Sequence, residues 1–401
     1  MSQLLRPLAG LRIADFTIHA AGPFSTHVLS QLGAECIKIE SNARPDAFRK
    51  PHAVYGRMTA ATFDQVSANK LSVRLNLKKP EAVALAKRIV AVSDVAAESF
   101  RPGVMKRLGL DFQNLREAKT DLVMLSLSAS GQDGPDSHFA GYAPLFGAWG
   151  GLGWMSGYTD GPPVEMRHVM DHSAGYHAVV ALLAALHQRR RTGEGQYIDL
   201  AARDVASAMI GDALVMASLG EAPIRPGNED LLMAPYGVYP TAVADRWLTL
   251  AVRNDEEWRA LTGVIGTPRA AHDHRFATAD ARCQNRTSLD LLITRWLSDR
   301  HAEATARRLQ QVGVCAHTSW NMQEVADDPH LRQRGALTQV EGPSTEKRFA
   351  VGMPACFSKT SDVGVRRGTP SLGQDEDYVF GELLGLSTEQ RAELEQREVI
   401  M

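Results

Sequence analysis

The sequence predicts an α/β protein with a large domain built on a doubly wound parallel sheet, plus a smaller α+β domain. Three observations predict this. Short apolar strands alternate with helices through residues 11–127, a long apolar helix and another strand occupy residues 174–200, and the texture changes after Pro223 to turn-rich segments and short helices. Strands that alternate with helices are typical of parallel sheets, since each crossover packs a helix on the sheet.

The composition is that of an ordinary globular protein. Its 401 residues carry 44 Lys+Arg and 46 Asp+Glu, giving a formal net charge of -2, and 44% of them are hydrophobic. This excludes overall disorder and allows two or three domains. The charge balance argues against a nucleic-acid partner, and no apolar run reaches the roughly 18–20 residues of a membrane span.

The cysteines indicate a reduced protein. They lie far apart, form no C-x-x-C pair and do not make a disulfide scaffold. The N-terminus lacks the basic start and long apolar stretch of a signal peptide. We therefore expect a cytoplasmic protein. The four cysteines are Cys36, Cys283, Cys315 and Cys356.

The first part of the chain is predicted as alternating strands and helices. Gly22-Pro23 begins a helix that Gly33 ends, and Pro80 begins an amphipathic helix. Strand 71–75 alternates with period two, as a half-buried strand does. The predicted strands are 11–16, 35–40, 71–75, 94–97 and 122–127, with helices at about 22–32 and 80–89.

A glycine-rich patch at 147–154 resembles a dinucleotide-binding loop at first sight. Its glycines miss the G-x-G-x-x-G spacing, and no strand directly precedes it. The patch therefore predicts close helix packing.

The clearest helix is expected to begin after Asp171. It is apolar nearly all round over 174–186, which predicts a buried helix. Three arginines, 189–191, fall in its last turn and Gly193 ends it, before a strand at 196–200.

The later part of the chain predicts the small domain. Its elements are a strand at 247–252, helices around 256–264, 289–297 and 303–312, a loop-rich stretch at 336–368, and C-terminal helices at about 378–384 and 388–397. We expect a large domain over 1–222, a small α+β domain over 223–335, and a linker and C-terminal part over 336–401 that returns to the large domain.

Asp171 is the strongest candidate for chemistry. A carboxylate just before a helix accepts free amide N–H groups and lies at the positive end of the helix dipole. Both effects favour the ionised form, so Asp171 is suited to nucleophilic attack at neutral pH, and the same amides would stabilise an oxyanion. Asp is also a common N-cap without any further role, and position alone favours that simpler interpretation.

Other motifs are weaker. The histidines His168, His172 and His177 surround Asp171 but match no standard metal-ligand spacing, so we expect no metal. No G-x-S-x-G or Walker loop occurs. Several cations suit phosphate contacts, although for each residue taken singly solvated surface charge is the favoured explanation. They are Lys78, Lys79, Arg101, Lys106 and Arg107.

An ordered series of motifs covers almost the whole chain. They are PLAGLR (7–12), AGP (21–23), LGAE (32–35), IKIE (37–40), NK (69–70), LKKPE (77–81), DV (94–95), ESFRPGV (98–104), RLG (107–109), GQDGP (131–135), DGPP (160–163), Asp171 with AG (174–175), AAL (184–186), RTGEGQ (191–196) and PSLGQD (370–375). This series resembles the class III CoA-transferase family, which includes formyl-CoA transferase and carnitine CoA-transferase.

The resemblance implies a Rossmann-like large domain built from both ends of the chain, with the small domain between them. Two ring-shaped subunits would interlink into a homodimer, with the active site between domains. Asp171 would attack a donor thioester to give an aspartyl–acyl anhydride and CoA thiolate. The thiolate would return to form an aspartyl-CoA thioester, from which an acceptor carboxylate takes the CoA, without ATP or metal.

The resemblance also implies the CoA contacts. Lys78 and Arg107 would bind phosphates, and the other residues would line the nucleotide and pantetheine. The full set is Ala20, Ala21, Leu75, Asn76, Leu77, Lys78, Ser99, Phe100, Arg101, Arg107, Leu127, Ser128, Ala129 and Ser130. The small-molecule partners are then an acyl-CoA and a carboxylic acid.

The chain departs from formyl-CoA transferase in three respects. Ala20 replaces a Gln, Ser130 replaces an aromatic residue, and the glycine-rich loop over the active site is missing. These changes predict a roomier acyl site, lined by Met166, Met170 or Tyr236.

Three alternatives remain. The related α-methylacyl-CoA racemases use a Gly-His-Asp segment, but this chain has Gly141-Tyr142-Ala143, which disfavours racemisation. Intramolecular CoA transfer would use the same Asp171. A CoA-binding protein without catalysis is the third alternative, and an intact Asp171 argues against it.

Overall fold

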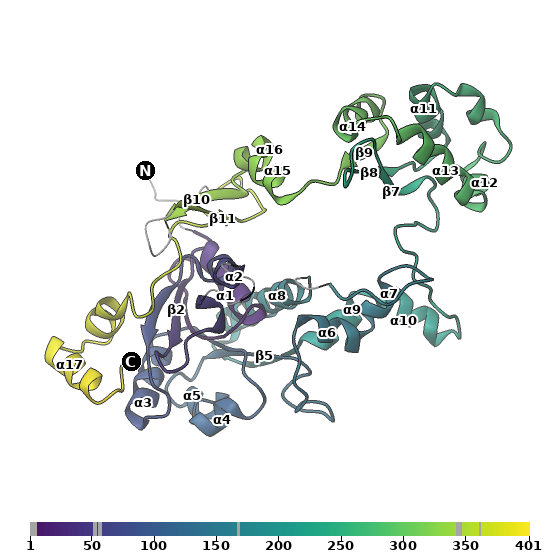
Figure 1. Cartoon of the computed structure of the whole chain (residues 1–401). Coiled ribbons are helices and arrows are strands. Elements are labelled where there is room, and N and C mark those ends of the chain that lie inside the picture. The colour runs from purple at the N-terminus through teal and green to yellow at the C-terminus, as the bar shows by residue number, and fades with distance from the viewer. Residues whose placement is uncertain (1–5, 51–53, 55–57, 167–168, 342–346, 361) are drawn as a thin grey trace. The chain divides into compact units, whose positions relative to one another are not determined.

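The computed structural model describes residues 6–50, 54, 58–166, 169–341, 347–360 and 362–401 (Figure 1). The chain forms two compact units. The first unit comprises Met1–Gly153, Glu165–Val215 and Pro329–Met401, and the second comprises Trp154–Val164 and Met216–Asp328.

The first unit is built on a six-stranded parallel sheet in the order β3-β2-β1-β4-β5-β6. Its strands are β1 Arg12–Phe16, β2 Glu35–Glu40, β3 Leu71–Arg74, β4 Val95–Glu98, β5 Val123–Ser128 and β6 Tyr197–Ala201. The order runs outward from β1 in one direction and from β4 in the other, so the winding reverses between these two strands. The predicted doubly wound α/β fold is confirmed, and each strand predicted in this part of the chain lies within a residue of its observed limits.

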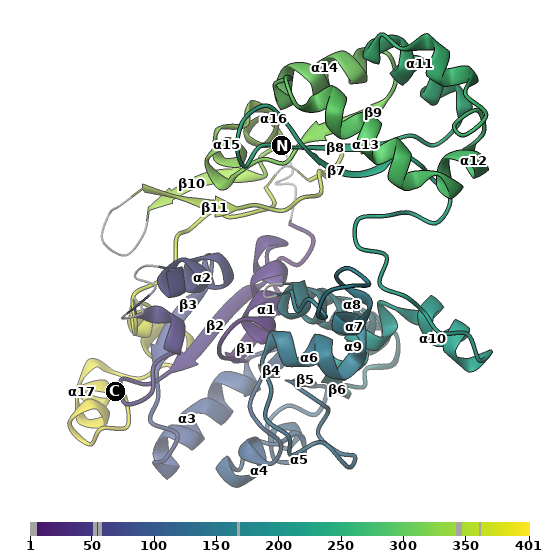
Figure 2. The same ribbon diagram turned by 45° about the vertical axis from the view of Figure 1, so that its right-hand side comes forward.

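Helices cover both faces of this sheet (Figure 2). Ile13 and Val95 belong to one apolar cluster, which includes residues of the helices α1 Ala21–Gln31, α8 Val169–Thr192 and α9 Ala202–Ala208. Their neighbours Ala14 and Ala96 belong to a second cluster with α3 Pro80–Ala91 on the opposite face. Strands covered on both faces explain why most residues of β1, β4 and β5 are apolar.

Shorter helices and a hairpin complete the first unit. They are η1 Ala47–Arg49, α2 Met58–Ser67, α4 Val104–Leu108, α5 Phe112–Arg116, α6 Ala143–Gly150, α7 Leu152–Met155, α10 Gly211–Ser218, α16 Pro329–Gln333, the π-helix η3 Asp377–Leu383, α17 Thr388–Gln396, and the strands β10 Leu337–Glu341 and β11 Lys347–Val351. Helices α7 and α10 cross the boundary between the units. The hairpin corrects the prediction of a loop-rich stretch, because polar residues on both strands conceal the alternation of an edge hairpin.

The glycine-rich patch covers the second half of α6 and most of α7, where its glycines allow helices to pack closely. A Cβ added to Gly150 would lie 2.3 Å from Ala206 Cβ and 2.7 Å from the Arg203 carbonyl oxygen. The close contact between α6 and α9 therefore requires glycine, which confirms the packing interpretation.

Helix α8 corrects two predictions. It begins at Val169, so Asp171 lies in its first turn and is not the residue before it. Only one side of α8 is buried. Ala174 and Leu182 lie on that side, whereas Tyr176 and Val180 are exposed. By length and composition α8 is also apolar enough to cross a membrane, contrary to the expectation from the apolar runs of the sequence. The core helix of a globular protein passes the same test.

The second unit has a three-stranded antiparallel sheet in the order β7-β8-β9. Its elements are β7 Tyr236–Pro240, β8 Trp247–Ala251, α11 Asp255–Ile265, η2 Pro268–His272, α12 Ala279–Gln284, α13 Arg286–Leu297, α14 Ala302–Gln311, β9 Cys315–Thr318 and α15 Met322–Asp327. Its core centres on Trp258 and Leu248, both fully buried. The predicted α+β character is confirmed.

The segment after residue 370 packs beside β3. The Asp375 carboxylate accepts a hydrogen bond from the Ser72 N–H at 2.9 Å, and Glu376 pairs with Arg74 at 2.7 Å. Val379 and Phe380 are fully buried in the same cluster as α3. Residues from the two ends of the sequence therefore share one core.

Candidate active site

Four segments predicted to bind CoA follow four different strands of the parallel sheet. Ala20 and Ala21 follow β1, residues 75–78 follow β3, residues 99–101 follow β4, and residues 127–130 end and follow β5. Because the carboxyl ends of parallel strands meet at one edge, all four segments lie at that edge. In open α/β sheets this edge carries the ligand site, at the point where the strand order reverses.

The reversal point is held closed by direct bonds between the two loops that flank it. The Ile18 N–H donates to Ser99 Oγ at 2.9 Å, and the Ser99 hydroxyl donates to the Ile18 carbonyl oxygen at 3.1 Å. A Cβ added to Gly22 would lie 2.8 Å from Ser99 Cβ. The turn after β1 and the loop after β4 are therefore fixed to each other.

Two buried ion pairs support the same turn. Lys70 Nζ lies 2.8 Å from Asp15 Oδ2, Lys38 Nζ lies 3.4 Å from Asp46 Oδ2, and all four side chains are fully buried. Burial alone would raise the pKa of Asp15, but the charges of Lys70 and Lys38 hold it at about 2. The turn after β1 is therefore stabilised by two buried ion pairs in which each charge has an oppositely charged partner.

Helix α8 brings Asp171 to the same edge. It connects the parallel strands β5 and β6, so it runs against the strand direction and begins at their carboxyl ends. At its other end, Arg189 donates to Asp94 Oδ1 at 2.7 Å, beside the start of β4. A Cβ added to Gly175, one turn after Asp171, would lie 3.1 Å from the Ala21 carbonyl oxygen. The first turns of α1 and α8 are thus close neighbours.

The Asp171 carboxylate is half-buried. Among the residues that the structure describes, no group forms a hydrogen bond or an ion pair with it. Burial raises the pKa of Asp171 to about 6, against the smaller opposing effect of His172. This corrects the expectation that helix amides favour the ionised form, because Asp171 lies inside the first turn and receives no cap bond. At pH 7 about nine-tenths of the group is still ionised, and its raised basicity suits a nucleophile.

The predicted CoA contacts present cations and hydroxyls. Lys78, Arg101 and Arg107 are exposed and form no ion pair within the described ranges of the chain. The hydroxyls of Ser128 and Ser130 are buried and form no hydrogen bond there. Buried hydroxyls ordinarily have partners, so this edge has the donors and charges that a phosphorylated, amide-rich ligand requires.

Sequence reasoning missed Glu98 at the end of β4. It is fully buried, accepts a hydrogen bond from the Phe100 N–H at 2.7 Å, and has its pKa raised to about 7 by burial. Its place in the ESFRPGV motif was the only signal. It orders the loop that carries Ser99 and Arg101.

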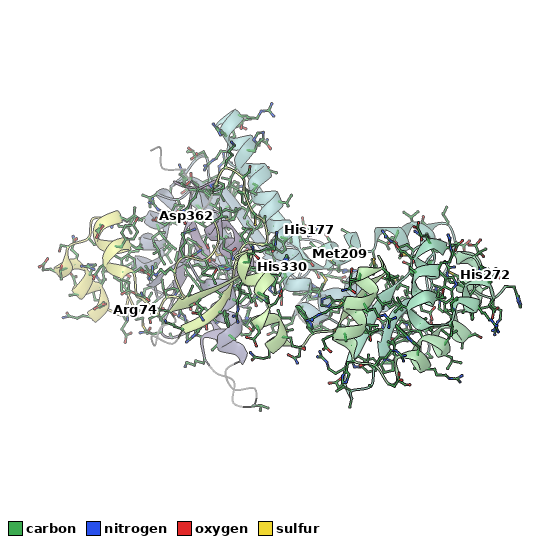
Figure 3. The ribbon with its side chains drawn as sticks, turned by 90° about the horizontal axis from the view of Figure 1, so that it is seen from above. Arg74, His177, Met209, His272, His330 and Asp362 are labelled. Atoms are coloured by element: carbon green, nitrogen blue, oxygen red, sulfur yellow. The ribbon has the colours of Figure 1, made fainter. Side chains whose placement is uncertain are left out.

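The histidines near Asp171 have separate roles. His168 lies outside the described residues. The His172 ring packs edge-on against Phe24 at 4.4 Å. His177, labelled in Figure 3, is exposed on α8. Its ring bonds the Ser173 carbonyl oxygen, one turn earlier in the same helix, at 2.9 Å. Over the described part of the chain, no group of three or more His, Cys, Asp or Glu residues is placed to hold a metal ion.

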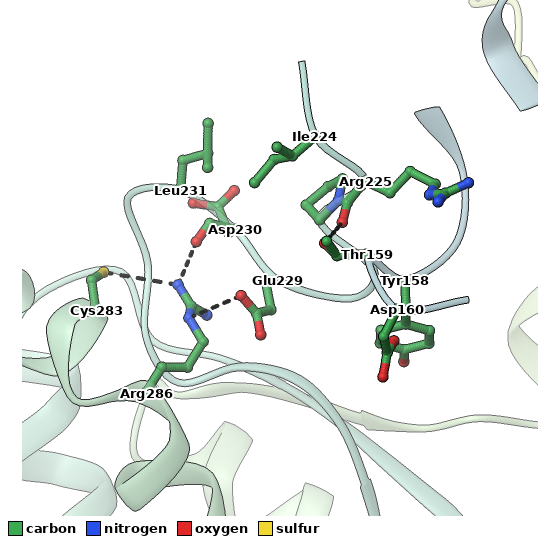
Figure 4. Close-up of a pocket in the computed structure, with 11 residues that line it drawn as sticks. Tyr158, Thr159, Asp160, Ile224, Arg225, Glu229, Asp230, Leu231, Cys283 and Arg286 are labelled. Atoms are coloured by element: carbon green, nitrogen blue, oxygen red, sulfur yellow. Dashed lines mark hydrogen bonds and ion pairs between the residues drawn. The ribbon is translucent and has the colours of Figure 1, made fainter. Parts of the chain in front are cut away.

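The second unit has a cavity of about 480 Å³. Arg286 crosses it and donates to the carbonyl oxygen of Asp230 at 2.5 Å, with Glu229 at 3.5 Å (Figure 4). It also donates to the Met233 carbonyl oxygen at 3.2 Å. Arg286 therefore holds the loop at residues 229–233 in place. Of the residues predicted to line the acyl site, Met170 is instead buried in the core of the first unit, Met166 is exposed there, and Tyr236 belongs to β7 of the second unit.

The family model "CoA-transferase family III" matches residues 8–376. The chain belongs to this family. It is 32% identical to the succinyl-CoA–D-citramalate CoA-transferase of Chloroflexus aurantiacus, covering 98% of both chains. It is also 32% identical to the succinate–glutarate CoA-transferase of Agrobacterium fabrum, covering 94% of this chain and 96% of that one.

A solved structure agrees with this assignment. The crystal structure of a CAIB/BAIF family protein from Brucella suis superposes with a TM-score of 0.86 at 29% identity, covering 94% of this chain and 100% of that chain. The family resemblance found in the sequence is confirmed, and the protein is a CoA-transferase with an acyl-CoA as substrate.

Proposed function

We propose that Asp171 is the nucleophile of an acyl-CoA:carboxylate CoA-transferase. The observation that carries this proposal is a half-buried carboxylate, without a partner among the described residues, in the first turn of a helix that begins at the CoA edge of the sheet. A carboxylate that is not neutralised by a cation keeps its nucleophilicity, and most of it is ionised at pH 7.

The proposed reaction has four nucleophilic steps. An Asp171 oxygen attacks the donor thioester carbonyl, the C–S bond breaks, and an aspartyl–acyl anhydride and CoA thiolate result. The thiolate attacks the aspartyl carbonyl, which forms aspartyl-CoA and releases the donor as its carboxylate. The acceptor carboxylate attacks aspartyl-CoA, and the released thiolate then attacks the acceptor's acyl carbon and restores Asp171. Every intermediate is an activated acyl group, so no nucleotide triphosphate is consumed.

The CoA would lie across the reversal point between β1 and β4. Lys78 and Arg107 would hold its phosphates, and Ser128 and Ser130 would donate to its pantetheine amides. The named relatives transfer CoA between succinate and citramalate or glutarate. We therefore propose succinyl-CoA as the donor to test first, with short dicarboxylic acids as acceptors.

We also propose that the protein is a cytoplasmic homodimer. Helix α8 exposes Tyr176 and Val180, and α10 exposes Leu214 and Val215, with Leu219 directly after it. Exposed apolar side chains that gather on a helix, as on α8 and on α10, are typical of an interaction surface. Light scattering after gel filtration should give twice the chain mass, and a monomeric mass would contradict the dimer.

The deciding experiment traps the covalent intermediates. Wild type and Asp171→Asn are incubated with succinyl-CoA and hydroxylamine and then measured as intact proteins by mass spectrometry. A CoA adduct or a hydroxamate that maps to Asp171, and that is missing from the Asn variant, is the expected result. Turnover by Asp171→Asn at close to the wild-type rate would overturn the mechanism.

A further inference from the structure

His19 has an unusual backbone for its residue type. It lies in the turn between β1 and α1, directly before Ala20, with φ of 66°. L-residues other than glycine rarely adopt this left-handed conformation, because it brings Cβ close to the following carbonyl oxygen. Such a conformation persists only where the surroundings enforce it.

Here three successive residues of the turn are held in place. The Thr17 carbonyl oxygen accepts from Lys38 Nζ at 2.8 Å, Ile18 is bonded to Ser99 in both directions, and the His19 N–H donates to Asp46 Oδ2 at 3.1 Å. Asp46 is itself paired with the fully buried Lys38. A buried ion pair therefore fixes the backbone that orients the His19 ring.

The ring lies between two aromatic side chains from different elements. Its centroid is 5.7 Å from that of Phe48 and 6.1 Å from that of Tyr142, and both contacts are edge-on. Burial lowers the pKa of His19; Lys38 and Arg44 lower it further, and Asp46 opposes them. The imidazole is then neutral at pH 7, with one N–H donor and one acceptor nitrogen. Neither nitrogen forms a hydrogen bond with a described residue.

The position of this ring is the edge where the reaction is proposed to occur. His19 follows β1 at the reversal of the strand order, and α1 begins two residues later against the helix of Asp171. We propose that His19 contacts the substrate in CoA transfer, donating its ring N–H to the acyl oxygen as Asp171 attacks the thioester. This rests on the proposed function of Asp171.

A donor at this place has a specific use. Negative charge develops on the acyl oxygen in the tetrahedral transition state, and a pre-oriented donor there is worth a factor of about 10² to 10³ in kcat. A neutral imidazole supplies that donor without forming an ion pair with the Asp171 carboxylate. The rigid turn keeps the donor in place before substrate arrives, which is the condition for such stabilisation.

The test separates the ring from the backbone. His19→Gly adopts a φ of 66° without strain and removes the ring, so a purely structural role predicts normal kinetics. With a catalytic ring we expect kcat to fall about 10²-fold in His19→Gly, while KM for succinyl-CoA changes by less than about threefold. His19→Asn, which tolerates the left-handed conformation and retains an N–H donor, should lose less activity.

Two further variants complete the test. His19→Phe keeps a ring of similar shape without the N–H and should match the loss in His19→Gly, which covers the case where the Gly variant fails to fold. His187→Asn changes an exposed histidine near the other end of α8 and should leave kcat unchanged. Wild-type kcat in either His19→Gly or His19→Phe would overturn the proposal. If Asp171→Asn is inactive while those variants are active, only the role of His19 fails; an active Asp171→Asn would remove both proposals.

Discussion

The two ends of α8 differ in how their charged groups are satisfied. At the carboxyl edge of the sheet, Asp171 has no hydrogen-bond or ion-pair partner among the described residues. At the amino edge, Arg189 binds the Asp94 carboxylate at 2.7 Å and the Asp94 and Asp121 carbonyl oxygens at 3.3 and 3.5 Å. The Arg189 guanidinium near the end of α8 therefore donates three hydrogen bonds, whereas the Asp171 carboxylate at its start accepts none from a described residue.

This difference suggests that one end of α8 contributes to stability and the other end to function. Removal of a partly buried charge with several partners destabilises the fold, because it leaves the partner groups unpaired. A half-buried charge without partners does not stabilise the fold and is typical of groups that serve a reaction. We therefore expect the Arg189 end of α8 to contribute to stability and the Asp171 end to contribute to the proposed reaction.

The largest expected effect is on activity at the first end of α8. Asp171→Asn should lower kcat by about 10³-fold or more, because it removes the proposed nucleophile. Since burial raises the pKa of Asp171 to about 6, loss of this charge should leave the thermal midpoint at pH 8 unchanged or raise it. Steady-state assays and calorimetry on one sample check both parts, and a large fall in the midpoint would contradict the comparison.

The second expected effect is on stability at the other end. Arg189→Met leaves Asp94 and Asp121 without their shared cation, so we expect a loss of about 2 kcal/mol in the free energy of unfolding. Urea denaturation of wild type and variant measures this loss. The folded variant should keep the wild-type kcat at 25 °C, and a selective loss of kcat would show that the two ends are coupled.

A third change lies between the two ends. Gly175→Ala would place a Cβ 2.7 Å from Phe24 Cδ1 and 3.1 Å from the Ala21 carbonyl oxygen, which forces α1 and α8 apart. Overpacking of this kind costs about 1–3 kcal/mol, and it should also lower kcat by displacing Asp171. The matched control is Gly263→Ala in α11, where an added Cβ meets nothing within 4 Å. It should stabilise the protein by up to about 1 kcal/mol.

The smallest effect is the pH dependence. The pKa of Asp171 is raised to about 6, so kcat/KM should fall about tenfold between pH 8 and pH 5 as the carboxylate is protonated. The sign for stability is opposite. A carboxyl whose pKa is raised on folding binds protons more tightly in the folded state, so its contribution is present at low pH and is lost as pH rises towards 6.

Local patterns in the sequence predicted most of the first unit. Strand 35–40 and the helix that Pro80 begins were found at their observed starts, because alternation and N-terminal proline are local signals. The start of α8 was misplaced because Asp171 resembles a cap, although the helix extends two residues further back. The hairpin β10–β11 lacks a strong local signal, since its pairing partners lie in two polar strands.

The site was only partly predictable. The family resemblance pointed to Asp171 and to the loops after four strands, but the strand order that gathers those loops arises from tertiary packing. The left-handed backbone of His19 depends on Asp46 and Lys38, which are distant in sequence, so no local pattern marks it. The raised pKa of Glu98 likewise follows from burial between neighbouring strands.

The position of the last residues has a consequence for biosynthesis. Val399 and Ile400 are buried with Leu85 and Ile89 of α3, so the hydrophobic cluster on that face of the sheet closes only when the ribosome has released residue 400. The second unit, which lies wholly before that point, has its own core and is free to fold earlier. Until residues 399 and 400 pack there, this apolar cluster of the first unit is incomplete, and exposed apolar surface of that kind favours aggregation.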